Sequence, residues 1–356
     1  MSDARLRYGI IGTGMMGCEH IRNLRLVPGV EVAAIADPHA ASLAAGRLAL
    51  GREVESYSDA RELLRRARLD AVVVASPNFT HYDVLRAIFE TDLHVLVEKP
   101  LCTEVDDCLR VAEASEKHAG IVWVGMEYRY IRPVARLVEE VHAGAIGRLR
   151  MLAIREHRFP FLRKVDDWNR FNRFTGGTLV EKCCHFFDLM NLIARQRPVR
   201  VYASGGADVN HRDERYGGEI PDILDNAYAM VDFAEGARAL LDLCMFAENA
   251  RNEMEIAATG DRGKAEVFVP EQKLLLTRRD RDEPTQIAFP TDARLAQAGA
   301  HHGSTFFEHL AFRDAIRAGG APVVSARDGA LAVAMGAAGE RSVREGRPVA
   351  LAEYGL

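Results

Sequence analysis

The sequence has few of the features that mark membrane, secreted or metal-binding proteins. Only 6 of its 356 residues are cysteine, and no two have the spacing Cys-x-x-Cys. This usage is typical of reduced thiols in a cytosol. No apolar run approaches the length of a membrane span, and no signal-peptide-like stretch precedes the first strand-like segment. We therefore expect a cytoplasmic protein.

The sequence also lacks an excess of basic residues. It has 46 Lys and Arg against 51 Asp and Glu, for a formal net charge of −5. This balance argues against nucleic acid or an anionic membrane as the main partner. The hydrophobic fraction of 48% and the charged fraction of 27% are ordinary for a globular protein. The length suits one large or two medium domains.

A glycine-rich motif follows the first apolar run. Its residues are Gly12, Thr13, Gly14, Met15, Met16 and Gly17, and Asp37 follows twenty residues later at the end of a second apolar run. Glycines allow a tight turn and a close approach to a pyrophosphate, and the acid binds ribose hydroxyls. The motif predicts a dinucleotide site for NAD, with NADP disfavoured because the Asp37 carboxylate repels a 2′-phosphate.

Residues 1–125 alternate short apolar runs with helical stretches, which predicts a Rossmann domain with a doubly wound parallel sheet. Four loops at the carboxyl ends of its strands should meet in one crevice. The predicted cofactor-binding residues in these loops are Gly12 to Gly17, Asp37, Ser76, Pro77, Asn78, His81, Glu98 and Lys99.

The pattern changes after Gly125. Runs such as 149–157, 226–233 and 237–246 alternate apolar and polar residues or are joined tightly, which indicates antiparallel strands. We expect a second α/β domain over 126–356, with a mostly antiparallel open sheet and helices near 178–194, 304–318 and 328–345.

Lys99 is the first candidate catalytic residue. It follows the apolar strand 94–97, between Glu98 and Pro100. A lysine held at a cofactor crevice can bind a hydroxyl oxygen and transfer its proton. The alternative is a surface lysine at the end of a strand.

Glu181 and His185 are the other catalytic candidates. In a helix that starts near Thr178, they share one face with Asp188. This arrangement suits proton transfer, but Thr178 and Glu181 also match a capping box, and His185 could be a core histidine bonded to Asp188. Cys183 and Cys184 point in different directions on a helix, so we expect no metal site here.

Weaker candidates for substrate contact lie in the predicted second domain. They are Tyr128, Arg129, Trp168, Asn169, Asn172 and His302.

These motifs together resemble the glucose–fructose oxidoreductase, inositol dehydrogenase and rhizopine-catabolism (Gfo/Idh/MocA) family. The resemblance rests on the glycine motif, Asp37, the Glu98-Lys99-Pro100 element, and Gly176-Gly177 followed by Glu181 and His185. It implies NAD(P) in the first domain, substrate and an oligomer interface in the second, and catalytic roles for Lys99 and His185. Glu181 occupies a position where inositol dehydrogenase-like members carry aspartate, and Lys182-Cys183-Cys184 departs from the usual small and apolar residues.

The sequence thus predicts an NAD(H)-dependent dehydrogenase that oxidises a secondary hydroxyl of a cyclitol, sugar or sugar derivative, acting as a homodimer or homotetramer. One alternative is an NAD-dependent enzyme that cleaves glycosides through transient oxidation. Another is a non-catalytic regulator that senses a dinucleotide; the presence of both Lys99 and His185 argues against it.

Overall fold

The computed structural model describes residues 5–290, 295, 299 and 301–356. By packing, the chain forms two compact units. The first consists of Met1–Glu127, Lys164–Asp166 and Asp292–Val333, and the second of Tyr128–Arg163, Asp167–Thr291 and Ala334–Leu356. The units thus interleave along the chain, and a division into separate domains at 125/126 stays a prediction.

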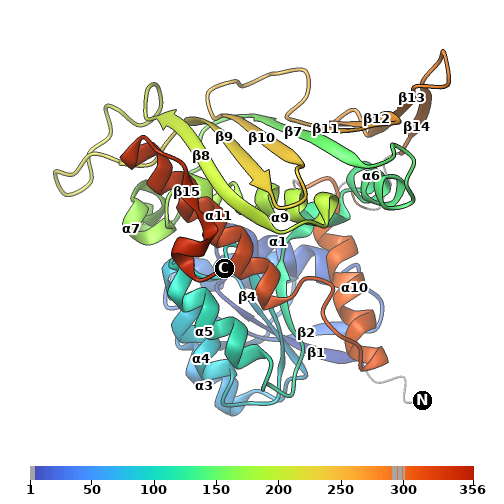
Figure 1. The fold of residues 1–356 in the computed structure, drawn as a ribbon. Coiled ribbons are helices and arrows are strands. Elements are labelled where there is room, and N and C mark those ends of the chain that lie inside the picture. Colours follow the sequence, from blue (N-terminus) through green and yellow to red (C-terminus); the bar gives the residue numbers. More distant parts are fainter. Residues whose placement is uncertain (1–4, 291–294, 296–298, 300) are drawn as a thin grey trace. The chain divides into compact units, whose positions relative to one another are not determined.

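A six-stranded parallel sheet forms the centre of the first unit (Figure 1). Its strands are β1 (Leu6–Ile11), β2 (Val30–Ala36), β3 (Glu55–Tyr57), β4 (Ala71–Val74), β5 (His94–Glu98) and β6 (Val122–Gly125). The order β3-β2-β1-β4-β5-β6 is that of a Rossmann fold. All four residues of β4 are fully buried, as expected for a strand covered on both faces. The predicted parallel sheet is confirmed.

Helices alternate with these strands and flank the sheet. They are α1 (Met15–Leu24), α2 (Ala40–Leu50), α3 (Ala60–Arg66), the short η1 (Asn78–Thr80), α4 (His81–Ile88) and α5 (Val105–Ser115), joined by α10 (Ser304–Ala318) from far along the chain. α10 packs on α1. The strand order reverses between β1 and β4, so the crevice for a ligand lies beyond the carboxyl ends of these strands.

A nine-stranded sheet dominates the second unit. Its strands are β7 (Leu149–His157), β8 (Pro198–Gly206), β9 (Asn226–Phe233), β10 (Arg238–Cys244), β11 (Met254–Gly260), β12 (Gly263–Val269), β13 (Lys273–Arg278), β14 (Thr285–Ala288) and β15 (Val349–Ala350). β7 and β10 pair in parallel, and every other pair is antiparallel. The predicted mostly antiparallel sheet is confirmed.

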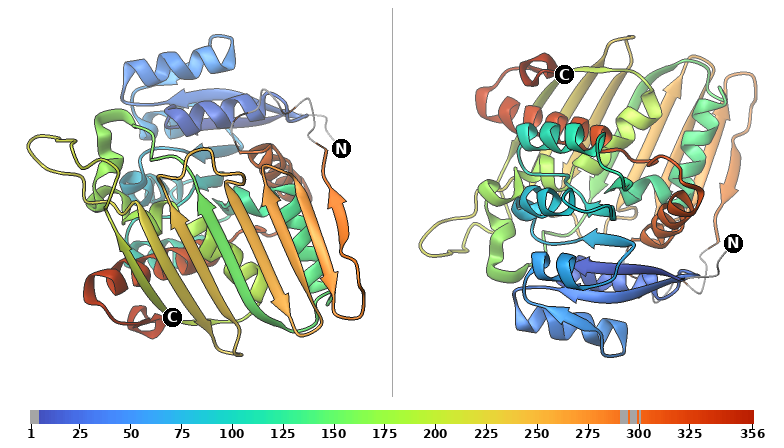
Figure 2. Two further views of the ribbon diagram at one scale, coloured as in Figure 1. Left: turned by 90° about the horizontal axis from the view of Figure 1, so that it is seen from above. Right: turned by 90° about the horizontal axis from the view of Figure 1, so that it is seen from below.

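The helices of the second unit cover one face of this sheet and leave the other open (Figure 2, left). They are α6 (Arg132–His142), α7 (Asn172–Thr175), α8 (Thr178–Glu181), α9 (Cys184–Ala194), η5 (Leu351–Tyr354), and the parts of η2 (Glu127–Tyr130), η3 (Val165–Arg170) and α11 (Ala326–Glu345) that belong to this unit. On α11, the Ser342 hydroxyl accepts the Ala203 N–H of β8 at 2.8 Å. On β9, alternate residues such as Val231 are buried between the layers.

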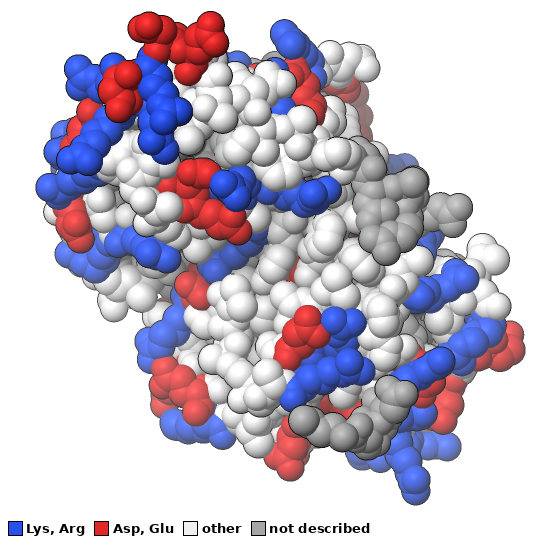
Figure 3. All heavy atoms as spheres, turned by 90° about the vertical axis from the view of Figure 1, so that its right-hand side faces the viewer, with Lys and Arg blue, Asp and Glu red and all other residues white. Residues whose placement is uncertain are grey.

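Charged side chains of both signs are interspersed over the face of the molecule in Figure 3. Within the described part of the chain, no helix has the length and apolar character needed to cross a membrane.

Candidate active site

The glycine turn after β1 is built for close backbone approach. Gly12 has φ +88°, and a Cβ there would lie 2.5 Å from the Ser76 backbone nitrogen. A Cβ on Gly17 would lie 2.0 Å from the Gly12 carbonyl oxygen. Any side chain at either position would push β1, α1 and the loop after β4 apart. Gly14 faces open space, where a ligand can approach the chain.

Asp37 fixes the neighbouring loop and keeps acceptor capacity. Its carboxylate accepts the Thr13 N–H at 2.8 Å and the His39 N–H at 2.9 Å. α1 begins at Met15 without a side-chain cap, so the N–H groups of its first turn are available to an anion. Uncapped amides beside a carboxylate fit the pyrophosphate and ribose of a dinucleotide.

The loop that holds Ser76, Pro77 and Asn78 is tied to the turn after β5 by His81. This ring is fully buried, with Nδ1 2.9 Å from the Pro100 carbonyl oxygen and Nε2 3.0 Å from that of Ser76. Burial lowers the pKa of His81, although these carbonyls oppose the shift. His81 thus links the loop after β4 to the turn after β5.

The Glu98 side chain holds the backbone at Lys99. The Lys99 N–H donates to Glu98 Oε2 at 3.1 Å, and His20 Nε2 lies 2.7 Å from Glu98 Oε1. Burial alone would raise the pKa of Glu98, but the bond and charge of His20 and the charge of Lys99 outweigh it, and the pKa lies below its usual value. Glu98 is therefore an ionised, buried anchor directly before the candidate catalytic lysine.

In the second unit, the predicted helix over 178–194 is wrong in one respect: it is split into α8 and α9. The Cys183 N–H bonds to the Thr178 carbonyl, five residues back. The Cys184 thiol lies 3.7 Å from the Glu181 carbonyl oxygen, which a continuous helix would use for its own backbone bond. The i, i+4 relation between Glu181 and His185 therefore does not place them on one regular helix.

The capping-box interpretation of Thr178 and Glu181 is also wrong. The Thr178 hydroxyl donates to the Leu224 carbonyl at 2.7 Å, and the N-cap of α8 is Gly177. Glu340 of α11 caps the helix instead, because it accepts the Leu179 N–H at 2.8 Å. Gly177 has φ +99°, and a Cβ there would lie 2.4 Å from the Glu340 carboxyl group, so this glycine makes room for the cap.

His185 stacks on the ring of Tyr128, whose hydroxyl contacts a buried ion pair. Its ring lies parallel to the Tyr128 ring, with 4.1 Å between centroids and 5° between planes. The Tyr128 hydroxyl lies 2.8 Å from Lys182 Nζ, which forms an ion pair with Glu156 at 2.7 Å. All of these side chains are buried. The His185 ring is therefore fixed from one side by an aromatic face that a buried ion pair anchors.

Arg129 and Asp188 form a bidentate ion pair within the second unit. Arg129 Nε donates to Asp188 Oδ2 at 2.6 Å, and Nη2 donates to Oδ1. Both side chains are buried. The pair ties the turn after β6 to α9, so Arg129 supports the segment that carries Tyr128.

The candidates Asn169 and Asn172 hold loops together. Asn169 Nδ2 donates to the Leu162 carbonyl, and the Asn172 amide donates to the Asp222 carbonyl, both at 2.9 Å. Trp168 is buried next to them. His302 is exposed and belongs to the first unit, in the turn before α10.

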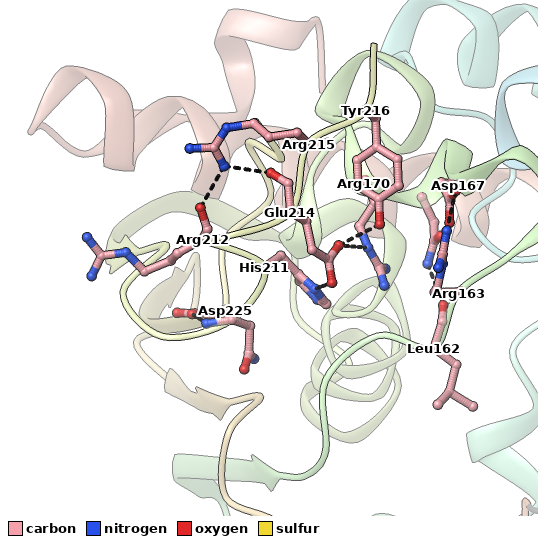
Figure 4. A network of polar contacts seen from close by, with 12 residues as sticks. Leu162, Arg163, Asp167, Arg170, His211, Arg212, Glu214, Arg215, Tyr216 and Asp225 are labelled. Carbon is pink, nitrogen blue, oxygen red and sulfur yellow. Dashed lines mark hydrogen bonds and ion pairs between the residues drawn. The ribbon is translucent and has the colours of Figure 1, made fainter. Parts of the chain in front are cut away.

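A polar network joins the same segment to the long loop between β8 and β9 (Figure 4). Glu214 is at its centre, accepting from Arg170 Nε at 2.9 Å and from the Tyr216 hydroxyl at 2.6 Å, with His211 Nδ1 at 2.9 Å. Burial raises the pKa of Glu214, but these three bonds outweigh it and lower the pKa to about 2. The loop is thus fastened to the buried Arg170.

Sequence reasoning missed the partners behind the candidate residues. His20, Glu127 and Glu340 have no motif of their own, and Lys182 was noticed only as a departure from a family pattern. His20 could have been found by its place three residues after Gly17, on the inner side of α1. Among the described residues, no three His, Cys, Asp or Glu side chains are grouped so as to hold a metal ion.

Two family models match most of the chain. Residues 6–126 match "Oxidoreductase family, NAD-binding Rossmann fold", and residues 138–351 match "Oxidoreductase family, C-terminal alpha/beta domain". The chain is 28% identical to a "Myo-inositol 2-dehydrogenase" of Thermotoga maritima, over 98% of this chain and 99% of the relative. It is 42% identical to "Inositol 2-dehydrogenase 3" of Saccharopolyspora erythraea, over 44% of this chain and 46% of the relative.

Solved structures share the fold. A "probable dehydrogenase from Thermotoga maritima" superposes with a TM-score of 0.79 at 29% identity, covering 98% of this chain and 100% of that one. A "Levoglucosan dehydrogenase, complex with NADH and levoglucosan" superposes with a TM-score of 0.84 at 20% identity, covering 98% and 99%. The glycine turn, Asp37 and both matched models agree: the chain is an NAD-binding oxidoreductase of the Gfo/Idh/MocA family.

Proposed function

We propose that this oxidoreductase is an NAD(H)-dependent dehydrogenase that oxidises a secondary hydroxyl of a cyclitol, sugar or sugar derivative. The observation that carries the proposal is Lys99, on a backbone anchored by the ionised Glu98, in the same unit as the glycine turn and Asp37. The 28% identity over 98% of the chain to a protein named for myo-inositol supports a polyol substrate.

Each candidate residue then has a role in the proposed reaction. NAD, when bound, supplies the hydride acceptor. Lys99 or His185 removes the proton from the substrate hydroxyl, and the Lys99 ammonium stabilises the negative charge that develops on that oxygen. Glu181 holds a further hydroxyl of the substrate. Tyr128 keeps the His185 ring in one orientation through their parallel stacking.

Asp37 supports NAD over NADP. Its carboxylate already holds the Thr13 and His39 N–H groups, so it is fixed as an acceptor for ribose hydroxyls and repels a 2′-phosphate.

The open sheet face supports a homo-oligomer. Tyr202, Met230 and Leu240 form one row across β8, β9 and β10, and each is at least 40% exposed. We assign a second copy of the chain as its cover, in a dimer or tetramer. The six free cysteines support a reducing, cytoplasmic location.

A substrate panel tests the proposal. Inositols, aldoses, anhydrosugars and aminosugars are each incubated with NAD or NADP while nicotinamide absorbance is followed. The expected result is NADH formation with at least one polyol, faster with NAD than with NADP. Bond cleavage without net NADH would favour the glycoside-cleaving alternative, and NAD binding without any turnover would favour the regulator.

A further inference from the structure

Glu127, Glu19 and His301 are titratable groups that the proposed reaction does not use, and the charge of Lys99 acts on Glu127. They lie on α1, on the turn after β6 and on the segment before α10, all within the first unit. Glu127 is 2% exposed and Glu19 is 6% exposed, whereas the His301 side chain is 27% exposed. The exposed fraction of these side chains therefore increases from Glu127 and Glu19 to His301.

His301 stands between the two carboxylates. Its Nδ1 lies 2.6 Å from Glu19 Oε1, and its Nε2 lies 4.0 Å from Glu127 Oε1. The Thr305 hydroxyl donates to the same Glu19 oxygen at 3.2 Å, which fixes that carboxylate. One water molecule can span the 4.0 Å between His301 and Glu127. Each ring nitrogen of His301 thus faces a different proton acceptor.

The backbone before α10 is shaped to bring His301 to this place. Gly299 has φ +136°, and a Cβ there would lie 2.6 Å from the Glu19 carboxyl carbon. No other residue would let this segment approach Glu19 so closely without displacing it.

Glu127 and Glu98 have opposite tendencies although they are neighbours. Burial raises the pKa of Glu127, as do the charges of Glu98 and Glu19, while His301 and Lys99 act against the rise. Glu98 has a lowered pKa, and His20 and the Lys99 N–H occupy its oxygens. Of these two carboxylates, Glu127 is therefore the one whose proton affinity is raised, so it is the better suited to take up and release a proton.

Glu98 also contacts a pair of buried histidines, His20 and His309. His20 Nδ1 lies 2.9 Å from His309 Nε2, and both rings are fully buried. Burial, together with the charge of His20, holds the pKa of His309 well below its usual value. This histidine pair therefore fixes Glu98, and neither of its rings is exposed to solvent.

We propose that Glu127 and His301 carry the proton of the reaction from Lys99 to solvent, with Glu19 holding the His301 ring in line. The inference rests on the proposed function, because oxidation of a secondary alcohol gives one hydride to NAD and releases one proton. That proton passes from the Lys99 ammonium to the Glu127 carboxylate and then to His301 Nε2. The proton on Nδ1 leaves to Glu19 or water, and the reverse sequence applies to reduction.

The kinetic test uses Glu127→Gln and His301→Asn, with His118→Asn as a matched control. His118 is a partly buried histidine of the same unit that bonds to the Leu93 carbonyl at the other end of β5. In dilute buffer, kcat of both relay variants should fall roughly 10-fold or more, with an unchanged KM for NAD. Added imidazole should restore kcat in His301→Asn. Full activity in both relay variants, or a loss in His301→Asn that imidazole does not restore, would overturn the relay.

A second measurement does not depend on turnover. Glu340 also has a raised pKa, so infrared difference spectra over pH are compared between the wild type and Glu127→Gln. The wild type should show the carbonyl stretch of an additional protonated carboxyl group that titrates above the ordinary range of glutamate and is absent from Glu127→Gln. His301→Asn should move its midpoint upward, because the imidazolium charge that opposes protonation is gone. Absence of this signal would contradict the relay even if the protein oxidises polyols. Its presence without polyol oxidation would leave the relay standing and refute the proposed substrate class.

Discussion

At the scale of single residues, Asp37 is expected to set the choice of cofactor. Asp37→Asn keeps an acceptor for the Thr13 N–H, which bonds to Asp37 Oδ2 at 2.8 Å, and removes the negative charge. We predict that the ratio of kcat/KM for NADP to that for NAD rises about 10-fold, since the repulsion of a 2′-phosphate is lost. Steady-state kinetics with both cofactors checks this, and an unchanged ratio would show that Asp37 does not discriminate.

Tyr128 is expected to matter for its ring more than for its hydroxyl. Tyr128→Phe keeps the stacking on His185, whose centroid lies 4.1 Å away, and removes the hydroxyl that Lys182 Nζ contacts. Tyr128→Leu removes the aromatic face. We predict that kcat falls roughly 10-fold or more in the leucine variant, because a misplaced catalytic group costs rate, and stays near the wild-type value in the phenylalanine variant. Equal losses in the two variants would assign the role to the hydroxyl.

At the scale of elements, the start of α8 depends on a cap from a distant helix. Glu340 of α11 accepts the Leu179 N–H, and burial raises its pKa to about 7. A carboxyl group whose pKa is raised in the folded state stabilises that state while protonated. This stabilisation is present in full below the unfolded-state pKa near 4.5 and is lost as the pH rises toward 7.

Glu340→Gln tests this dependence, because the amide oxygen still accepts the Leu179 N–H and has no charge to bury. Between pH 4.5 and pH 7, the free energy of unfolding of the wild type should fall relative to that of the variant by up to about 3 kcal/mol. Denaturant titrations at a series of pH values measure this difference. Glu235→Gln, at an exposed hairpin turn, is the control and should run parallel to the wild type. A pH-independent difference for Glu340→Gln would contradict the buried cap.

Local sequence patterns predicted some of the strands and helices and missed others. The apolar runs of β2, β4 and β5 and the alternation in β9 predicted strands that the structure confirms, because burial on one or both faces leaves a local signature. β3 was missed, since Glu55–Tyr57 is a short edge strand without an apolar run. The capping of α8 by Glu340 was missed because this residue lies more than 150 residues away in the sequence.

The candidate site divides in the same way. The glycine motif was recognisable because Gly12 and Gly17 are required by the local backbone, which leaves no room for a Cβ at either position. The groups that hold Lys99 and His185 were not, since the contacts of His20 with His309 and of Lys182 with Glu156 join distant parts of the chain. Long-range pairs of this kind leave no periodicity in one sequence.

At the scale of the whole molecule, the open sheet face should control assembly. Met230→Glu combined with Leu240→Glu places like charges side by side in the exposed row. We predict that the wild type sediments as a dimer or tetramer and the double variant as a smaller species, because a buried interface does not accept unpaired charges. Leu48→Glu, which is 84% exposed on α2, should leave the assembly intact. A monomeric wild type would contradict the interface.

The central proposal is that Lys99 and His185 are the catalytic groups in polyol oxidation by NAD. A single-turnover experiment tests it most directly: NAD-loaded protein is mixed with the best substrate of the panel, and NADH absorbance is followed for the wild type, Lys99→Met, His185→Gln and the surface control Lys117→Met. We predict that the hydride-transfer rate falls roughly 100-fold or more in both site variants, while Lys117→Met transfers hydride at the wild-type rate. Hydride transfer at the wild-type rate in Lys99→Met would contradict it.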